Sequence, residues 1–133
     1  MGTRSTTHIV DHSGESPVSL ARLYIQYDGY PTGVGNDIKT ILGGKTLVNG
    51  YNDGATQING AGCMAAMLIA GLKKGCGGVY MKAPTCEQEE EFNYTVTAKG
   101  SGEPIELRIV AYEKEIYNGT LEDFDPQAVE AAA

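Results

Sequence analysis

The residues most able to do chemistry lie between Tyr27 and Asn36, in the segment YDGYPTGVGN. This segment holds an aspartate and two tyrosines among three glycines and a proline. Tyrosine rings stack on flat ligands, a carboxylate accepts hydrogen bonds from hydroxyls and amines, and glycines leave backbone amides open to a ligand. The sequence therefore predicts a ligand-binding corner here, centred on Asp28. The alternative is a rigid turn, in which Tyr30-Pro31 and the glycines only shape the backbone.

Two other segments are candidates to complete this site. Arg4 lies at the very start of the first predicted strand, and a hairpin would bring its guanidinium near Asp28, where it can bind a phosphate or carboxylate. A plain salt bridge between Arg4 and Asp28 is the other interpretation. The segment NGAGC at 59–63 opens a predicted helix and offers further unpaired amides. The predicted ligand-binding residues are Arg4, Gln26, Asp28, Gly29, Tyr30, Gly33, Gly35, Asn36, Asn59 and Gly60.

Signals for catalysis and for metal binding are weak. Cys63 lies near a predicted helix start, where the dipole favours a thiolate, but a nucleophile needs a base and the only histidines are His8 and His12. In a continuous strand these histidines lie about 13 Å apart, too far for one metal ion. Neither phosphate-loop fingerprint is present, nor a zinc-protease motif. We therefore predict no catalytic residue, no metal and no cofactor, and a binding protein rather than an enzyme.

Composition excludes several classes of protein. The chain of 133 residues carries 17 acidic and 10 basic side chains, a net charge of −7, which argues against a protein that tracks nucleic acid phosphates. The three cysteines are an odd number with no CxxC pair, which indicates reduced thiols and a cytoplasmic location. The longest apolar run, Ala61 to Leu72, is shorter than the roughly 20 residues of a membrane span, so no membrane partner is expected.

The elements that must position the site follow from hydrophobic periodicity. Alternating residues predict strands at 3–11, 18–28, 77–83, 92–98 and 105–111, with a possible extension at 114–117. Helices are predicted at 37–42 and 60–74, with a short one at 121–124. The acidic run at 87–91 is predicted to be a solvated loop. The order ββ-α-α-βββ predicts a single α+β domain at residues 1–126: a mostly antiparallel sheet, the apolar helix at 60–74 buried on one face, and a frayed tail at 127–133.

Three segments resemble a family of small uncharacterised proteins from bacteria and their phages. They are the start MGTRSTTHIVD, the loop segment YIQYDGYPTGVG and the helical segment NGAGCMAAMLIAGLKKGCGGVYM. Members of that family begin with MGTRS, carry a QxDGYPxGxG loop, and have an NGxGCxAA helix followed by GGxY. The likeness covers roughly residues 1–83. This chain has Val34 where the family loop often has a histidine, so no role that rests on an imidazole carries over.

These observations predict a protein that binds a small polar or phosphorylated ligand, a nucleotide being one such molecule. The resemblance to phage proteins implies an accessory role in host-defence evasion, in which the protein sequesters a host signalling molecule in the host cytoplasm. A structural or protein-interaction module that forms a homo-oligomer is the first alternative. A small phosphoester hydrolase that uses Cys63 and His8 is the second.

Overall fold

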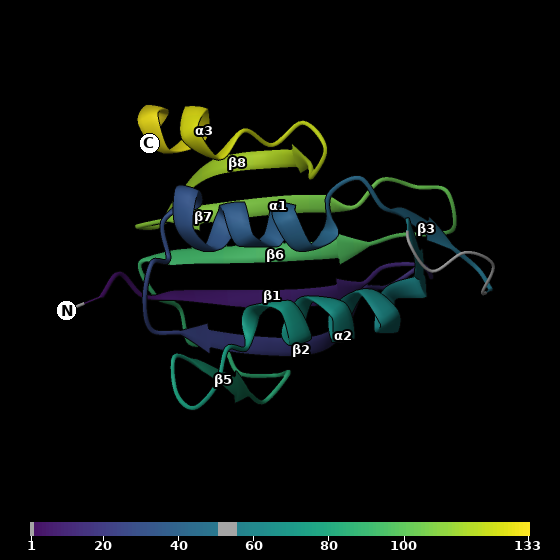
Figure 1. The fold of residues 1–133 in the computed structure, drawn as a ribbon, viewed down its shortest axis with the longest axis horizontal. Coiled ribbons are helices and arrows are strands. Elements are labelled where there is room, and N and C mark those ends of the chain that lie inside the picture. The colour runs from purple at the N-terminus through teal and green to yellow at the C-terminus, as the bar shows by residue number, and fades with distance from the viewer. Residues whose placement is uncertain (1, 51–55) are drawn as a thin grey trace.

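A six-stranded sheet forms the centre of the fold, which the computed structural model describes for residues 2–50 and 56–133 (Figure 1). The strands are β1 (Ser5–Asp11), β2 (Val18–Ile25), β5 (Val79–Lys82), β6 (Phe92–Ala98), β7 (Glu106–Ala111) and β8 (Lys114–Thr120). They lie in the order β5-β2-β1-β6-β7-β8. All neighbours are antiparallel except β1 and β6, which are parallel. The predicted α+β class with a mostly antiparallel sheet is therefore confirmed.

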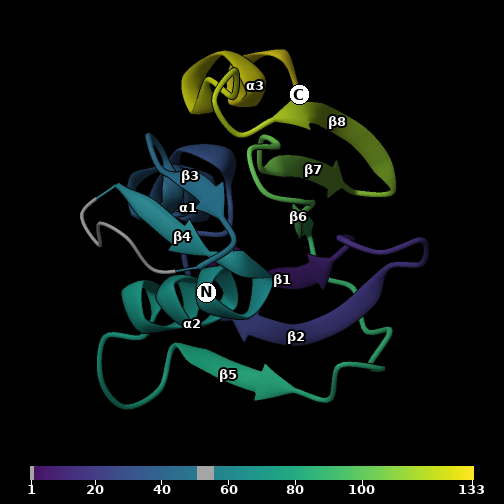
Figure 2. The same cartoon turned by 90° about the vertical axis from the view of Figure 1, so that its right-hand side faces the viewer.

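The helices cover one face of this sheet. A π-helical turn, η1 (Pro31–Gly35), runs directly into α1 (Asn36–Leu42), and α2 (Gly60–Leu72) packs against α1 and on β1, β2 and β6. Figure 2 shows α1 and α2 on one side of the strands. Two short parallel strands, β3 (Thr46–Val48) and β4 (Gln57–Asn59), connect the two helices. The predicted order ββ-α-α-βββ does not contain this pair, because three-residue strands leave no clear alternation.

Helix α2 is buried along one side only. Met64, Leu68 and Leu72 face the core, whereas Ala66 and Ala70 are exposed. The sequence predicts that this apolar helix is buried on one face of the sheet, and the structure buries only its inner side, because the fold has a single helical layer and every helix in it keeps an outer face. Small residues on that outer face leave little apolar surface in water. In the part of the chain that the structure describes, no helix is long and apolar enough to cross a membrane.

The C-terminal residues are helical where the sequence predicts a frayed tail at 127–133. Helix α3 (Pro126–Ala132) begins after Asp125, whose carboxylate accepts hydrogen bonds from the amides of Gln127 and Ala128. An N-cap aspartate followed by proline is a strong helix start. The carboxylate of Glu130 accepts hydrogen bonds from the amide and hydroxyl of Thr32, at 3.0 and 2.8 Å, so α3 is docked on η1. The short helix predicted at 121–124 is a turn.

The connection between β5 and β6, residues 83–91, crosses the face of the sheet opposite to α1 and α2. It must cross, because β2 and β1 lie between β5 and β6 in the sheet (Figure 2). The carbonyl of Pro84 accepts hydrogen bonds from Ser19 and Arg22 on β2, at 2.9 and 3.2 Å. The acidic run predicted to be a solvated loop is therefore attached to the sheet, and Arg4 pairs with Glu90 and Glu91 within it.

Candidate functional site

The loop after β2 is folded tightly on Asp28. This residue adopts a left-handed conformation with φ of 60°, which aspartate tolerates better than most side chains. Its carbonyl accepts the amide hydrogen of Val34 at 2.8 Å, and the amide of Gly33 bonds the carbonyl of Tyr30 at 2.8 Å. These bonds lead into the π-helical turn η1, in which the amide of Asn36 donates to the carbonyl of Pro31. Such turns often occur at functional sites.

The core anchors this loop from below. The hydroxyl of Tyr94, on β6, donates a buried hydrogen bond of 2.7 Å to the carbonyl of Gly29. Burial raises the pKa of Tyr94, which therefore stays protonated and remains a donor. The amide of Gly29 donates to the carbonyl of Thr3 at 2.9 Å. The predicted corner around Asp28 is thus a rigid piece of backbone.

A cavity of about 350 Å³ opens beside Asp28. It lies where four segments meet: the end of β2, the start of α1, the residues after α2, and the turn before β5. Its polar lining comes from Tyr27, Asp28, Asp37 and Lys74. Its remaining wall is apolar side chains and glycine backbone: Ile25, Val34, Leu72, Gly77, Gly78 and Val79.

The charges in this cavity act on one another. The pKa of Asp37 is raised, chiefly because neighbouring atoms remove its carboxyl from part of the solvent, and further by the negative charge of Asp28. The cation of Lys74 acts in the opposite direction and lowers this pKa. The hydroxyl of Tyr30 donates to the carboxylate of Asp28 at 3.1 Å, a bond that raises the pKa of Tyr30. Two carboxylates and one ammonium group therefore share a single small cavity.

Asp37→Asn is expected to raise the melting temperature by at most about 1 °C at pH 7, because Asp37 is itself exposed and water screens much of the effect. A raised pKa means that the folded state accepts the charge of Asp37 less readily than the unfolded state does. The stability that protonated Asp37 contributes is therefore fully present at a pH below its ordinary pKa of 3.8, and it is lost as the pH rises through the pKa of the folded state. Melting curves should show the gain at pH 7 and its disappearance at about pH 3. A gain of equal size at both values would contradict this, and the exposed Asp123→Asn is the control.

Of the ten predicted residues only Asp28 lines this cavity, and three of the others lie well away from it. The guanidinium of Arg4 lies 3.6 and 3.5 Å from the carboxylates of Glu90 and Glu91, so it pairs with them and not with Asp28. Asn59 and Gly60 are at the start of α2, whereas the cavity is at its end, about 19 Å away at the rise of a helix. The side chain of Asn59 there accepts the amide hydrogen of Gly50 at 2.9 Å.

The other predicted residues do not line the cavity, and most of them shape the backbone beside it. The amide of Gln26 bonds the carbonyl of Gly78 at 2.8 Å and holds the glycine turn against β2. Gly35 lies against the ring of Phe124. Asn36 borders a separate cavity of about 220 Å³ between η1 and the start of α3. The loop residues Gly29, Tyr30 and Gly33 are part of the backbone frame around Asp28.

The ligand-binding residues predicted from the sequence do not include Asp37 and Lys74, although both line the cavity. In the sequence, Asp37 stands where a residue can cap a helix start, and Lys74 where a cation suits the C-terminal end of a helix dipole. Both roles are local. The start of α1 and the end of α2 meet because the two helices pack side by side in opposite directions (Figure 1). The glycines directly after Lys74 are the one local feature of the sequence that marks the C-terminal end of α2 as a possible part of a site.

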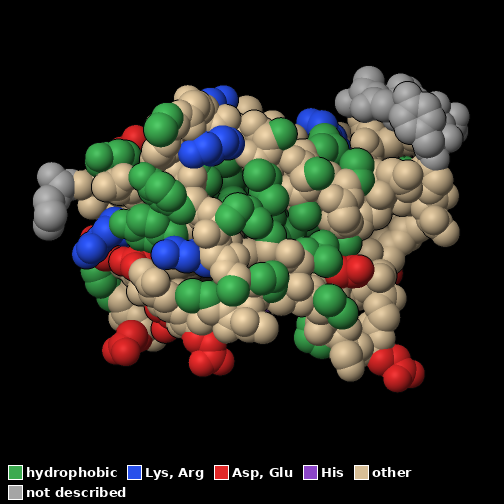
Figure 3. All heavy atoms as spheres, turned by 90° about the horizontal axis from the view of Figure 1, so that it is seen from below, with side chains coloured by type: hydrophobic (Ala, Val, Ile, Leu, Met, Phe, Trp, Pro, Cys, Tyr) green, Lys and Arg blue, Asp and Glu red, His purple; other side chains and the backbone are tan. Residues whose placement is uncertain are grey.

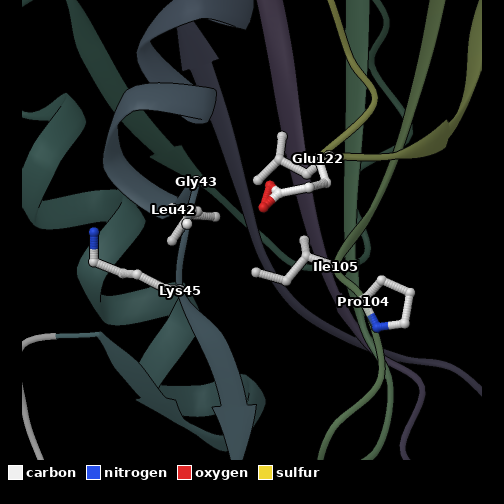
Figure 4. Close-up of a pocket in the computed structure, with 8 residues that line it drawn as sticks. Leu42, Gly43, Lys45, Pro104, Ile105 and Glu122 are labelled. Carbon is white, nitrogen blue, oxygen red and sulfur yellow. The ribbon is translucent and has the colours of Figure 1, made fainter.

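A second cavity, between the end of α1 and the start of β7, is less suited to a ligand. Its volume is about 110 Å³, and its walls are mainly apolar, with Leu42 facing Ile105. Figure 4 shows Lys45 extending away from Glu122, and its ammonium group donates to the carbonyl of Ile41 at 3.0 Å. No residue of the predicted site lines it.

The residues of the hydrolase alternative lie apart. The sulfur of Cys63 contacts that of Met67 at 3.8 Å on α2, whereas His8 bonds Ser19 on the opposite face of the sheet. Among residues 2–50 and 56–133, no group of three or more histidines, cysteines and carboxylates is placed to hold a metal ion. Comparison of the chain with protein-family models, with curated proteins and with solved structures found no match.

Proposed function

We propose that this protein binds a small polar, phosphorylated molecule of the nucleotide type in the cavity beside Asp28. The observation that carries the proposal is the meeting of Tyr27, Asp28, Asp37 and Lys74 around one cavity of about 350 Å³. That volume lies in the range of small-molecule sites in proteins. The backbone around Asp28 is already fixed by hydrogen bonds, so a ligand need not order it on binding.

Each polar side chain has a counterpart in such a ligand. The ring of Tyr27 is 55% exposed at the rim, which leaves a face on which a base can stack. The carboxylates of Asp28 and Asp37 accept hydrogen bonds from sugar hydroxyls or base amines. The ammonium group of Lys74 attracts a phosphate, the role that the sequence assigns to Arg4.

The neighbouring lysine has a structural role. The ammonium group of Lys73 donates to the carbonyls of Gly77 and Val79, at 3.0 and 2.8 Å, and so holds the turn that closes the cavity. Lys74 makes no such bond to the described residues and is left for a ligand. Because no nucleophile and base converge here, the proposal is binding without turnover. In a phage, as the sequence resemblance implies, it would sequester a host signalling nucleotide.

The test is a thermal-shift screen with nucleosides, nucleotides and sugar phosphates. At least one nucleotide should raise the melting temperature by several degrees, because a ligand that binds only the folded state stabilises it. Asp28→Asn and Lys74→Gln should each weaken that ligand at least about tenfold, since each removes a charged hydrogen-bonding partner. Arg4→Gln and the exposed Lys114→Gln should leave the affinity unchanged. No stabilisation by any compound, or equal affinities in all four variants, would refute the proposal.

An interaction module remains the second candidate because one sheet edge is apolar. Strand β5 forms that edge and exposes Tyr80 and Met81, by 47% and 60%. Figure 3 views the molecule from this edge and shows hydrophobic side chains gathered beside lysines and arginines. An unpaired edge strand can pair with a second copy of the chain. A dimer in solution that Met81→Lys dissociates, together with a silent ligand screen, would favour this function over ligand binding.

A further inference from the structure

The face of the sheet opposite to α1 and α2 carries a row of basic and polar residues. Cross-strand pairing places Lys82 beside Arg22, Arg22 beside His8, His8 beside Thr95, and Thr95 beside Arg108. The row therefore crosses five strands, from β5 to β7, and carries three permanent cations. Arg108 is paired with Glu115 at 2.6 Å, so the row keeps two cations, Lys82 and Arg22, in excess over that carboxylate in a protein whose net charge is −7.

This face is hollow at the middle of the row. A cavity of about 230 Å³ lies there, with His8, Arg22, Thr95 and Arg108 in its lining. The connection at residues 83–91 forms one wall, because the Pro84 carbonyl is bonded to β2. The lining is almost entirely polar. The cavity is separate from the one beside Asp28 and shares no residue with it.

Hydrogen bonds determine which groups in this cavity are available to a ligand. The hydroxyl of Ser19 donates to the Pro84 carbonyl at 2.9 Å, so it accepts from Nε2 of His8, 2.7 Å away. Burial, and then the charge of Arg22, lower the pKa of His8, which is therefore neutral at pH 7. Arg22 bonds Pro84 through Nε and Arg108 bonds Glu115 through Nε at 2.6 Å. Within the described residues, the terminal nitrogens of both guanidinium groups are left for a ligand.

We propose that this cavity is a second binding site, which takes a small anion with a phosphate or diphosphate group between Arg22 and Arg108. Two guanidinium groups can bind such an anion from both sides with paired hydrogen bonds. The Cα atoms of these residues are about 14 Å apart at the strand spacing, so two extended side chains can reach one diphosphate. The hydroxyl of Thr95 lies on the same cavity wall as a further donor, whereas that of Thr6 already donates to the side-chain oxygen of Asn93 at 2.7 Å.

One carboxylate in the lining of this cavity repels a bound anion. Glu89 borders the cavity from the crossing connection, whereas its neighbours Glu90 and Glu91 share the single cation of Arg4. Its negative charge must weaken the binding of a second negative group. Removing that charge should therefore strengthen binding, which is the opposite of what removal of either arginine does.

The experiment is calorimetric titration of the full chain with inorganic pyrophosphate at low salt. Arg22→Gln and Arg108→Gln should each weaken binding at least about tenfold, and Glu89→Gln should strengthen it a few-fold. Lys114→Gln is the matched control and should change the affinity by less than about twofold, because it lies outside this cavity. Lys74→Gln is a separate comparison, which shows whether pyrophosphate binds in the cavity beside Asp28 instead. The melting temperature of each variant must show that it is folded.

Three results would overturn the proposal. The first is no binding of pyrophosphate at millimolar concentration. The second is an affinity of both arginine variants equal to that of the unsubstituted protein. The third is loss of binding in Lys74→Gln alone. The last result would move the anion to the cavity beside Asp28 and so support the proposed function while refuting this second site. Conversely, if no nucleotide stabilises the protein in the screen, the proposed function fails, but pyrophosphate binding that depends on Arg22 and Arg108 would still support this second site.

Discussion

Gly33→Ala is expected to lower the free energy of unfolding by about 2–3 kcal/mol. A Cβ atom at this position would lie 2.1 Å from the carbonyl oxygen of Asp28, far inside the closest approach that carbon and oxygen tolerate. The oxygen cannot move away freely, because it accepts the amide hydrogen of Val34 at 2.8 Å. Relief of the clash must therefore open the turn that fixes Asp28.

Urea denaturation measures this loss, with Gly14→Ala as the control. A Cβ atom at Gly14 meets no other atom within 4 Å, so that substitution should change the free energy by less than about 0.5 kcal/mol. Equal denaturation midpoints for the two variants would contradict the tight turn. Gly33→Ala should also abolish nucleotide binding, because it displaces the backbone of Asp28.

Phe124→Ala is expected to cost about 3–5 kcal/mol of stability, the largest effect of any single substitution considered. The ring is fully buried, lies 5.1 Å from that of Tyr117 between centroids, and covers Gly35 at the junction of η1 and α1. The carbonyl of Phe124 also accepts from the ammonium group of Lys39. Truncation leaves a cavity under the loop and releases the segment that leads to α3.

Thermal and urea unfolding check this prediction, with two comparisons. Phe124→Leu retains most of the volume and should lose only about 1 kcal/mol. Met81→Ala removes a side chain that is 60% exposed and should be nearly neutral. If Phe124→Ala proves no more harmful than Met81→Ala, the C-terminal segment does not pack against the loop as described.

The sheet could be predicted largely from local patterns. In β6, the side chains of Phe92, Tyr94, Val96 and Ala98 alternate with polar residues and are the buried ones, so period-two alternation gave both the strand and its inner face. The loop at Asp28 was likewise visible, because glycine and proline restrict the backbone strongly. These features depend on residues within one short segment.

What the sequence could not predict depends on contacts between distant segments. The parallel pairing of β1 with β6 requires the connection at 83–91 to cross the sheet, and this crossing converts an apparently solvated acidic run into a cavity wall. Similarly, Lys74 lies at the site because α1 and α2 pack in opposite directions, whereas Arg4 is drawn to the acidic connection. A cation can be located in the sequence, but its partner is decided by the fold.

Amide chemical-shift mapping tests the central claim most directly. Isotope-labelled protein would be titrated with the nucleotide that stabilises it most in the screen. We expect the largest shifts at residues 27–29, at Asp37 and at residues 74–79, which surround the cavity beside Asp28. Shifts confined to Asn59 and Gly60, to the open face of the sheet, or absent everywhere would contradict a ligand site at Asp28.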